Sequence, residues 1–418
     1  MRRLAIAAGA ALLLVLGAGI AAVVYRNHED ASHRGSSTVE FNSTQVSKPA
    51  AHAAKEKIVW PTYGYDGARL RVGPVATLAP PYRTAWVAGG RSLLEFPPSI
   101  AYDRLFLVNA GGTVLAFSTK DGDRAWDYPT HRCAASTPAI GDYHHGTVYV
   151  TLLNRRPCKK SPKDGLVIAL SAGTRELRWS RTIGPSESSP LLIGNTLYVG
   201  DWLGDVYAMK ASTGAPIWKF KAGGAVKGAI AVSGNRLFVG AYDGHVYALD
   251  ATTGRKIWRA SGDARLFGGH GTFYSTPAVA YDRVYIGSTD GKVYSFGERT
   301  GKRRWSTRTG GYVYGSPAVW NDRVYVGSYD HYFYAFDAAT GAVDWKFKAN
   351  GPISGAATIV NGVVYFATLK GRTYGLDATS GRRVWSFPDG RYSPVVSDAK
   401  KIYLLGYASI YGLVPKRR

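Results

Sequence analysis

Tryptophan returns at a nearly constant interval along most of this chain of 418 residues. Five of the seven intervals between successive members of the series are 39 or 40 residues long, and the other two are 53 and 47. A fixed period of this size is typical of folds that repeat one supersecondary unit, because each unit buries its apolar face against the next. The members of the series are Trp86, Trp126, Trp179, Trp218, Trp258, Trp305, Trp345 and Trp385.

The same order of segments fills each interval. A step of small residues and proline opens the unit, and a run such as RVYVGS at 323–328 follows, whose alternation predicts a half-buried strand. An Asp-Gly pair, as at 243–244 and 290–291, then predicts a two-residue hairpin turn, because such turns need positive φ angles. A second strand such as HVYALD at 245–250 and a Thr-Gly turn lead to a last strand that carries the tryptophan. About four strands per unit is the content of a β-propeller blade.

The two ends of the repeat are incomplete and complement each other. Seven full units end at Trp385, and an eighth, within 392–414, has no tryptophan strand of its own. The strand expected at 82–89 carries Trp86 but lacks the three strands that should precede it. We therefore expect this strand to complete the last blade and close the ring, which leaves no free sheet edge between the chain ends. The sequence predicts an all-β fold, an eight-bladed β-propeller of four-stranded antiparallel blades over residues 82–418, with seven blades as the alternative.

The even spacing also predicts the role of the tryptophans. One large ring per blade can pack its face against the neighbouring blade, and burial of this kind contributes about 3 kcal/mol for each ring. Rings that follow one another around a propeller cannot converge on one ligand. We therefore expect all members of the series to dock blade against blade rather than to form an aromatic ligand site.

An uncharged run of 21 residues, at 4–24, follows two arginines at the amino end. As a helix it would extend roughly 31 Å at about 1.5 Å per residue, which matches the hydrocarbon core of a bilayer. The run is longer than the core of a secretory signal peptide and offers no clean cleavage site, so we expect an uncleaved transmembrane helix within residues 1–26, with a removed signal peptide as the alternative. The basic amino end predicts that the rest of the chain lies on the extracytoplasmic side of the cell membrane.

The next two segments lack the repeat. Residues 27–56 are rich in Ser, Thr, His, Ala and Lys without any period, which predicts a flexible polar stalk. Residues 57–81 form a lead-in segment ahead of the propeller. The sequence therefore predicts one membrane-spanning segment, a stalk and one folded domain.

The unit VYALDATTGRKIW at 246–258 resembles the tryptophan-docking repeat of the pyrroloquinoline quinone (PQQ) quinoprotein family, and the resemblance extends from near Tyr82 to Val414. The segment WPTYGYDGARLRVGP at 60–74 is similar to segments that precede such propellers. The family includes alcohol and glucose dehydrogenases and also a non-catalytic lipoprotein that assists outer-membrane β-barrel assembly, and the chain is nearest in character to the non-catalytic members. Since one scaffold serves many activities, the resemblance implies the fold and leaves the function to specific residues.

The resemblance implies particular residues for a quinone enzyme: an adjacent cysteine pair beside the cofactor, a set of Glu, Asn and Asp on Ca²⁺, and a catalytic aspartate. The two cysteines of the chain, Cys133 and Cys158, are 25 positions apart, so the adjacent pair is missing. The sequence also lacks a phosphate-binding Gly-Lys-Ser/Thr loop and the His-Glu-x-x-His, Gly-x-Ser-x-Gly and Cys-x-x-Cys-His motifs. It therefore favours a non-catalytic protein without cofactor or metal, in which PQQ and Ca²⁺ are disfavoured, and a PQQ-dependent dehydrogenase stays open as the alternative.

The two cysteines fit a structural role. The longest interval exceeds the usual period by 13 residues, and the surplus maps to NRRPCKKSPKDG at 154–165, an enlarged hairpin loop of the second unit. Cys133 lies in the loop that enters the first strand of the same unit, and the two loops can share one face of a propeller. We therefore predict a disulfide between Cys133 and Cys158, formed in an oxidising compartment, with free thiols as the alternative.

Residues three positions before the opening prolines should approach the central mouth of the ring together. Loops on one face of a propeller often build its binding surface. Carboxylates, aromatic rings and cations around one opening could hold a polar ligand or a peptide of a partner, and a solvated ring of mutually neutralising charges is the alternative. The predicted mouth residues are Glu95, Glu187, Tyr274, Tyr314 and Arg391, with Lys227 nearby.

The formal net charge of the chain is +23, so its surface is strongly basic. This excess favours anionic neighbours such as lipid head groups and acidic envelope polymers, and no feature indicates specific nucleic-acid binding; a merely solvated cationic surface is the alternative. The sequence predicts a protein held in the cell membrane through residues 4–24, whose extracytoplasmic propeller is a non-catalytic scaffold for an envelope protein or an anionic polymer. A PQQ-dependent oxidoreductase and a dedicated binder of acidic envelope polymer are the alternatives.

Overall fold

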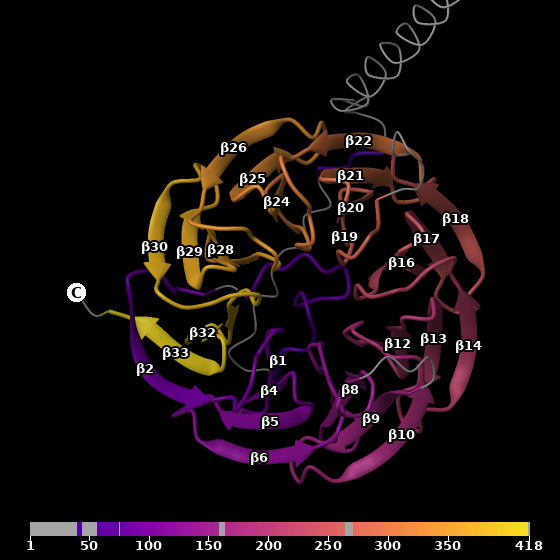
Figure 1. Ribbon diagram of the computed structural model, residues 1–418, viewed down its shortest axis with the longest axis vertical. Helices are drawn as coiled ribbons and strands as arrows, with labels where there is room; N and C mark the ends of the chain where they lie inside the picture. The colour runs from indigo at the N-terminus through magenta and orange to yellow at the C-terminus, as the bar shows by residue number, and fades with distance from the viewer. Residues whose placement is uncertain (1–39, 44–56, 75, 159–163, 264–270, 417–418) are drawn as a thin grey trace, which may run out of the picture.

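The chain forms a ring of eight β-sheets around a central axis (Figure 1). The computed structural model describes residues 40–43, 57–74, 76–158, 164–263 and 271–416. Each sheet is an antiparallel blade of four strands, and the first blade gains a fifth strand at its inner edge. The prediction of an eight-bladed propeller is confirmed, and the alternative of seven blades is excluded.

The strands of each blade follow one another from its inner edge, near the axis of the ring, to its outer rim. The first four blades contain β3 (Ser99–Ala101), β4 (Arg104–Val108), β5 (Thr113–Ser118) and β6 (Arg124–Pro129) in blade 1; β7 (Ala139–Gly141), β8 (Thr147–Leu152), β9 (Gly165–Ser171) and β10 (Leu177–Ile183) in blade 2; β11 (Leu191–Ile193), β12 (Thr196–Gly200), β13 (Asp205–Lys210) and β14 (Pro216–Lys221) in blade 3; and β15 (Ala231–Ser233), β16 (Arg236–Gly240), β17 (His245–Asp250) and β18 (Lys256–Ser261) in blade 4.

The other four blades repeat this order, and the last one takes its outer strand from the amino-terminal side. They contain β19 (Ala278–Ala280), β20 (Arg283–Gly287), β21 (Lys292–Gly297) and β22 (Arg303–Arg308) in blade 5; β23 (Ala318–Trp320), β24 (Arg323–Gly327), β25 (Tyr332–Asp337) and β26 (Val343–Lys348) in blade 6; β27 (Thr358–Val360), β28 (Val363–Thr368), β29 (Arg372–Asp377) and β30 (Arg383–Phe387) in blade 7; and β31 (Val396–Ser397), β32 (Ile402–Leu405), β33 (Ser409–Pro415) and β2 (Tyr82–Gly89) in blade 8. The fifth strand of blade 1 is β1 (Ile58–Trp60).

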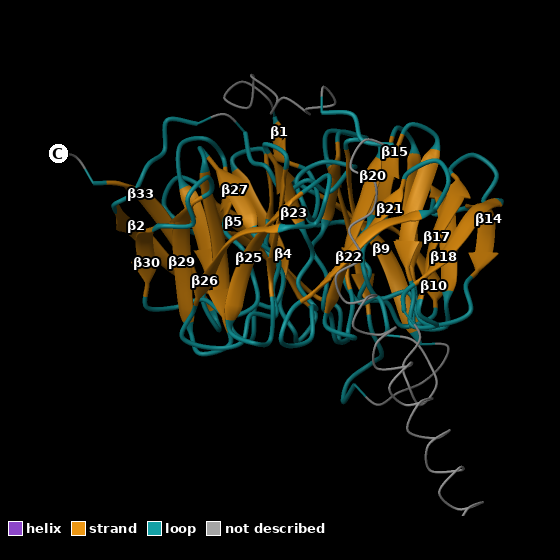
Figure 2. Cartoon of the chain, turned by 90° about the horizontal axis from the view of Figure 1, so that it is seen from above, coloured by secondary structure: helices purple, strands orange, loops and turns teal. Residues whose placement is uncertain are grey.

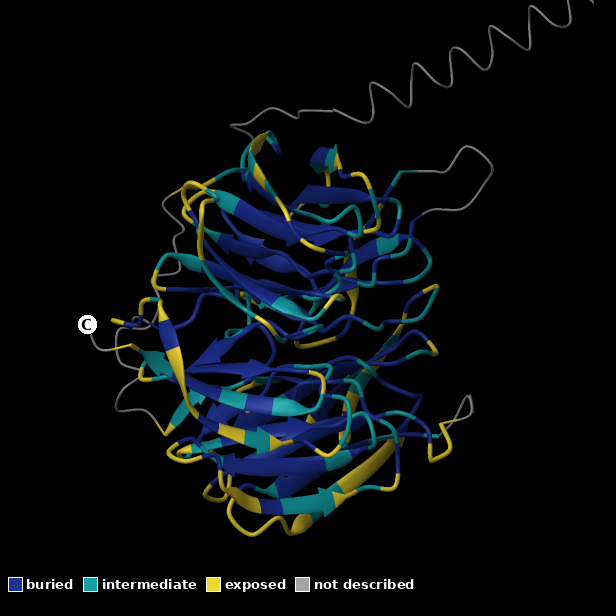
Figure 3. Cartoon of the chain, turned by 60° about the vertical axis from the view of Figure 1, so that its left-hand side comes forward, coloured by how far each residue is buried: buried dark blue, intermediate teal, exposed yellow. Residues whose placement is uncertain are grey.

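Burial falls from the middle strands of a blade to its rim (Figure 3). All six residues of β21 are buried, because this strand lies between neighbouring strands and between neighbouring blades. The outer strand β26 instead presents four exposed and two half-buried residues. The core therefore consists of the sheet faces pressed together around the ring, and its edge is solvated.

The turn between the second and third strands is longer than the sequence suggested. In blade 4 it comprises residues 241–244, and within it a positive φ angle, of 77°, occurs at Gly244. The Asp243 carboxylate accepts hydrogen bonds from the backbone N–H of His245, at 3.1 Å, and from the hydroxyl of Tyr247. An aspartate that caps the turn in this way removes the need for the second positive-φ residue of a two-residue hairpin.

The tryptophans dock each blade onto the next. The indole N–H of Trp305 donates to the carbonyl oxygen of Ala338 in blade 6 at 2.9 Å, and its ring covers Gly341, where an added Cβ would lie 2.6 Å from a ring carbon. Trp385 packs edge-on against Tyr82 of blade 8, with ring centroids 5.4 Å apart. The same indole-to-carbonyl bond, at 2.9–3.3 Å, is made by Trp86, Trp126, Trp179, Trp218, Trp258 and Trp345.

The two ends of the repeat meet in blade 8. β2 pairs antiparallel with β33, from Tyr82 opposite Pro415 to Gly89 opposite Ser409. Figure 1 shows the indigo strand beside the yellow one, although they stand at opposite ends of the sequence. The pairing closes the ring and covers an edge that β33 would otherwise expose.

The lead-in runs inside the ring rather than ahead of it. We call residues 57–74 the inner segment: it begins with β1 beside β3 and then contacts the innermost strands of later blades in turn. Beyond it, Leu78 packs in the apolar cluster of blade 8 with Val395. The carbonyl oxygens of the inner segment that accept a backbone hydrogen bond from blades 2, 4, 5, 6 and 7 belong to Pro61, Gly67, Ala68, Leu70 and Arg71. This arrangement was not predicted from the sequence.

Part of the expected stalk is docked on the propeller. The Glu40 carboxylate pairs with Arg304 and accepts a hydrogen bond from the hydroxyl of Thr300 at 2.9 Å. The ring of Phe41 lies 5.3 Å from that of Tyr281. These contacts fix residues 40–43 on blade 5, which differs from the expectation of a flexible stalk throughout 27–56.

The predicted anchor at 1–26 and the rest of the stalk lie outside the described residues. Within the described ranges, the structure has no helix that is long and apolar enough to cross a membrane. Figure 2 views the disc edge-on, with the connections between strands gathered at its two faces.

The predicted disulfide is confirmed. Cys133 and Cys158 are bonded, with their Cα atoms 5.9 Å apart. The backbone N–H of Cys133 donates to the carbonyl oxygen of Asn154 at 3.0 Å, and Arg132 pairs with Asp164 at 3.1 Å. The disulfide and these contacts hold the enlarged loop of blade 2 against the loop that enters β7.

Candidate binding cavity at the mouth of the ring

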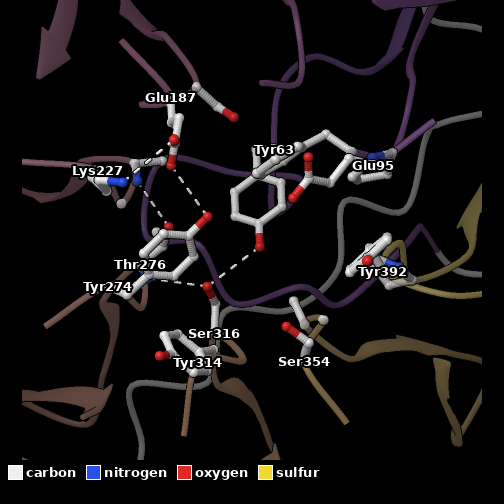
Figure 4. A pocket seen from close by; sticks show the side chains of 18 residues that line it. Tyr63, Glu95, Glu187, Lys227, Tyr274, Thr276, Tyr314, Ser316, Ser354 and Tyr392 are labelled. Atoms are coloured by element: carbon white, nitrogen blue, oxygen red, sulfur yellow. Dashed lines mark hydrogen bonds and ion pairs between the residues drawn. The ribbon is translucent and has the colours of Figure 1, made fainter. Parts of the chain in front are cut away.

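The loops that enter the innermost strands converge at one face of the disc and surround a cavity. We call it the mouth cavity; its volume is about 560 Å³, including the space open to solvent (Figure 4). Tyr63 of the inner segment forms part of its lining, so the amino-terminal segment contributes to the site from inside the ring. The charged and aromatic residues of the lining are Tyr63, Glu95, Phe96, Glu187, Lys227, Tyr274, Tyr314 and Tyr392.

The structure brings together most of the predicted mouth residues. The lining contains all of them except Arg391. The Arg391 guanidinium instead lies 5.4 Å from the ring centroid of Tyr407, and the next residue, Tyr392, takes its place in the lining. Their role in binding stays a prediction.

At one side of the mouth cavity, an ammonium group of the chain itself, that of Lys227, is bound by a carboxylate and aromatic rings. The Lys227 ammonium lies 3.5 Å from a Glu187 carboxylate oxygen. It also lies 4.3 Å from the ring of Trp202, 5.3 Å from that of Tyr242 and 6.0 Å from that of Tyr274, within the range of cation–π attraction. We call these four partners of Lys227 the ammonium cage.

Burial and the contacts within the ammonium cage shift the pKa values of Glu187 and Tyr274. Burial raises the pKa of Glu187, and Lys227, Tyr274 and Trp202 oppose this rise. The hydroxyl of Tyr274 donates to Glu187 at 3.3 Å, and burial together with that carboxylate raises the pKa of Tyr274 well above its usual value. Tyr274 is therefore a neutral phenol that acts as a hydrogen-bond donor at physiological pH.

A row of tyrosine rings continues from the ammonium cage around the rim. The ring centroids of Tyr274 and Tyr314 are 5.5 Å apart, and those of Tyr314 and Tyr329 are 5.1 Å apart. Tyr312 joins the row 5.9 Å from Tyr314 and is 52% exposed. These aromatic faces provide apolar contact with fixed polar ends, which suits recognition of an amphipathic group.

Glu95 stands apart from the ammonium cage, and no cation of the described residues pairs with it. Burial and the Glu187 carboxylate raise its pKa, and Lys227 opposes the rise. In the part of the chain that the structure describes, no group donates a hydrogen bond to its carboxylate and no cation pairs with it. Figure 4 shows this carboxylate beside Tyr63, directed into the cavity.

Hydroxyl groups beneath the rings hold the lining in place. The Ser316 hydroxyl oxygen accepts hydrogen bonds from the backbone N–H of Thr276, at 3.0 Å, and from the hydroxyl of Tyr63, at 3.3 Å. The Thr276 hydroxyl oxygen in turn accepts from the backbone N–H of Ala229 at 2.9 Å. Blades 4, 5 and 6 and the inner segment are thereby linked at the floor of the cavity, which favours a preformed site.

Sequence reasoning missed part of the site. Tyr63 lies in a segment without the repeat. Trp202 and Tyr242 lie in the turns between the second and third strands, where no binding residue was predicted. A usable signal existed for the latter two, because both turns are on the face that carries the loops entering the innermost strands. Aromatic residues in those turns are thus candidates for the mouth in any propeller of this topology.

Comparison with known proteins identifies the repeat. A family model described as outer membrane protein assembly factor BamB matches residues 163–312 and 290–410, which together make up more than half of the chain. The chain belongs to the PQQ-type β-propeller repeat family. No curated protein matches it significantly.

Solved structures of the PQQ-repeat fold include both assembly factors and enzymes. BamB from Moraxella catarrhalis is 18% identical with a TM-score of 0.65, over 80% of this chain and 100% of that one. Quinohemoprotein alcohol dehydrogenase from Comamonas testosteroni is 15% identical with a TM-score of 0.72, over 88% of this chain and 82% of that one. A europium-containing methanol dehydrogenase is 14% identical with a TM-score of 0.67, over 86% and 91%. At these identities the likeness shows the fold alone.

The residues of the mouth cavity do not fit the quinone and calcium site that the PQQ-repeat family implies for its enzymes. The carboxylates in the lining are Glu95 and Glu187, and the second is paired with Lys227. The two cysteines are joined across a loop of blade 2, and neither belongs to the lining. Among the described residues, no group of three His, Cys, Asp or Glu side chains is placed to hold a metal ion.

Proposed function

We propose that the protein is a non-catalytic binding scaffold of the cell envelope whose mouth cavity receives a polar segment of a partner protein. One observation carries this proposal: two carboxylates, a lysine and several aromatic rings converge on one open cavity at the centre of a rigid ring. A concave site that combines aromatic faces with a few polar groups is typical of ligand recognition. The named assembly factor among the solved relatives supports a scaffold role by analogy of fold.

The proposal includes anchoring in the cell membrane through residues 4–24, with the propeller on the extracytoplasmic side. The disulfide supports an oxidising compartment. The docking of residues 40–43 supports an orientation, because they bind the turns of blade 5 on the face opposite the mouth cavity. The 13 residues at 27–39 can span at most roughly 45 Å, so that face is held near the membrane and the mouth points away from it.

The experiment places a photo-crosslinking amino acid at the rim of the cavity. Tyr312 is 52% exposed there, and Val343, which is 44% exposed on outer strand β26, is the matched control position. Irradiation of native membranes should give a discrete protein adduct from position 312 and none of that size from position 343. The adduct should weaken when Tyr314→Ala removes part of the lining. Equal adducts from both positions, or none from position 312, would contradict the proposal.

The alternatives have separate readouts on the purified protein. Added PQQ and Ca²⁺ should leave the thermal midpoint unchanged and should not produce dye reduction; a raised midpoint with dye reduction would support a dehydrogenase instead. Binding to an acidic polymer that falls steeply with salt, without an adduct at position 312, would support the polymer-binding alternative.

A further inference from the structure

The mouth cavity contains two carboxylates in similar aromatic surroundings, and the chain provides a cation for one of them. Glu187 faces Lys227 within the ammonium cage. Glu95 shares the same cavity and lies beside Tyr63 (Figure 4), and Phe96 and Tyr392 belong to the same lining. We call these two parts of the mouth cavity the Lys227 half, or filled half, and the Glu95 half, or second half. The contacts of Lys227 in the first indicate which chemical group the second can bind.

The filled half shows that this kind of lining suits an alkylammonium group. In it, an aliphatic stem ends in a cation that meets one carboxylate oxygen at 3.5 Å and aromatic rings at 4.3–6.0 Å. Cation–π attraction and a carboxylate together bind ammonium groups well where water is partly excluded. Lys227 is only 21% exposed at its side chain, so this exclusion holds here.

The second half has the carboxylate and the rings, but among the described residues no cation pairs with its carboxylate. The rings of Tyr63 and Phe96 stand 5.9 Å apart in an edge-on arrangement beside Glu95. The Glu95 carboxylate receives no hydrogen bond or ion pair from the residues that the structure describes; only its backbone carbonyl oxygen accepts a hydrogen bond, from the Ser393 hydroxyl at 3.0 Å. A carboxylate in partial burial is stabilised when a cation joins it.

The buried charges beneath the lining hold the inner segment, and one of them also touches the lining: the Arg71 guanidinium lies 4.9 Å from the ring centroid of Tyr63. Arg69 donates through Nε to the carbonyl oxygen of Ile230 at 2.8 Å, and Arg71 donates through Nη1 to that of Pro317 at 2.7 Å. Asp66 accepts from the backbone N–H of Leu70 at 3.0 Å. These groups hold the inner segment in the ring, and the charges of the lining itself are Glu95, Glu187 and Lys227.

We propose that the Glu95 half of the mouth cavity binds an alkylammonium group, and that this group is a lysine side chain of the partner. The inference rests on the proposed function, because it names the chemistry of the segment that the scaffold receives. The bound ammonium would lie against the Glu95 carboxylate and beside the rings of Tyr63 and Tyr392, and Arg71 already covers one face of Tyr63.

The test uses n-butylammonium as the probe and 1-butanol as its neutral counterpart, with binding to the intact protein measured by saturation-transfer NMR titration. We expect saturable binding of n-butylammonium at least tenfold tighter than that of 1-butanol. Glu95→Gln, which keeps the shape of the side chain, should weaken it by about 10- to 100-fold, because a charge-assisted hydrogen bond is lost. Glu176→Gln, at an exposed turn of blade 2, removes the same charge far from the mouth and should leave binding unchanged.

The outcomes separate the ligand from the scaffold. Equal binding of the two probes, or binding that Glu95→Gln leaves unchanged, would overturn the proposal, provided that the variant keeps the wild-type unfolding midpoint or a higher one. A second comparison uses N-acetyl-lysine methylamide, which represents a lysine within a protein, and cadaverine, which represents a free diamine. Tighter binding of cadaverine would overturn the proposal that the ammonium group belongs to a partner protein. If the probes fail to bind while the crosslink at position 312 persists, the ligand class is wrong and the scaffold function stands.

Discussion

At the scale of single residues, Glu95 should destabilise the folded protein at neutral pH. Burial and the Glu187 carboxylate raise its pKa, so the folded chain holds this proton more tightly than the unfolded chain does. The stability that such a group contributes is fully present below its unfolded pKa and is lost as pH rises through its folded pKa. Glu95→Gln should therefore raise the thermal unfolding midpoint at pH 7 relative to the wild type, and the gap should close below about pH 4.

The control for this prediction is again Glu176→Gln, at an exposed position, which should leave the midpoint unchanged at all three pH values used below. Calorimetry at pH 3.5, 5 and 7 gives the comparison. A lower midpoint for Glu95→Gln at pH 7 would mean that the charged carboxylate has a stabilising partner in the folded state, and the ammonium site proposed at the Glu95 half of the mouth cavity would then be wrong.

The sequence predicted much of the mouth at this scale, and its single misplacement has a physical cause. Counting three positions back from each opening proline located Glu95, Glu187, Tyr274 and Tyr314 in the lining. The count assumes that every entering loop follows one path, and Arg391 departs from it because its guanidinium stacks on Tyr407 of the same blade. A position rule locates the backbone, but competing side-chain contacts decide which residue faces the cavity.

At the scale of elements, the contact between a tryptophan and the following Thr-Gly turn should be intolerant of a methyl group. Gly341 has a φ angle of 72°, and an added Cβ would lie 2.6 Å from the ring of Trp305. Gly341→Ala should therefore lower the free energy of unfolding by about 3 kcal/mol, from backbone strain and overpacking together. Urea unfolding followed by tryptophan fluorescence measures the change.

The matched control is Gly194→Ala. Gly194 also has a positive φ, of 55°, but an added Cβ would meet nothing within 4 Å. Its substitution should cost about 1 kcal/mol from backbone strain alone. Equal losses for the two variants would show that blade docking contributes nothing at Gly341.

This contact also explains why the repeat was readable from the sequence. The ring must meet a glycine with positive φ and a carbonyl acceptor in the next blade, so the geometry constrains residue types at fixed spacing. The turn after the second strand was harder to predict, because an aspartate side chain such as that of Asp243 can replace a backbone conformation. A sequence motif therefore predicts a contact that requires particular side chains. It does not predict the length of a turn that different residues can form in different ways.

The disulfide makes a second prediction at this scale. A bond that closes 25 residues should stabilise the protein by roughly 3 kcal/mol through the entropy of the unfolded chain. The double variant Cys133→Ser and Cys158→Ser should lose about that free energy of unfolding and retain the eight-bladed fold by circular dichroism. Reduction of the wild type should lower its midpoint to that of the variant, and an unaffected midpoint would contradict the prediction.

At the scale of the whole molecule, the closure of the ring was predictable and the inner segment was not. Two incomplete blades imply each other, so the pairing of β2 with β33 followed from counting strands. The inner segment binds partly through its backbone carbonyl oxygens, which every residue type offers, so these contacts leave no repeated pattern in the sequence. Tyr63 of the candidate site was missed for the same reason.

The final prediction uses truncated chains to separate the contribution of ring closure by β2 from that of the inner segment. A chain of residues 57–418 loses the docked residues 40–43, so its free energy of unfolding should fall by only about 2 kcal/mol, the worth of a charged contact. A chain of 79–418 keeps β2 and the closed ring but loses the inner segment. A chain of 90–418 loses both, and its exposed β33 edge should cause association, visible by size-exclusion chromatography.

The middle truncation decides how the propeller is stabilised. The inner segment buries Trp60, Tyr63, Leu70 and Val72, each at most 8% exposed. Burial of four such side chains contributes roughly 6–12 kcal/mol, which is comparable with the whole stability of an ordinary domain. We therefore expect the chain of 79–418 to lose cooperative thermal unfolding even though its ring can still close. If it unfolded at the wild-type midpoint, blade docking and closure would suffice, and the inner segment would serve only to supply Tyr63 to the mouth cavity.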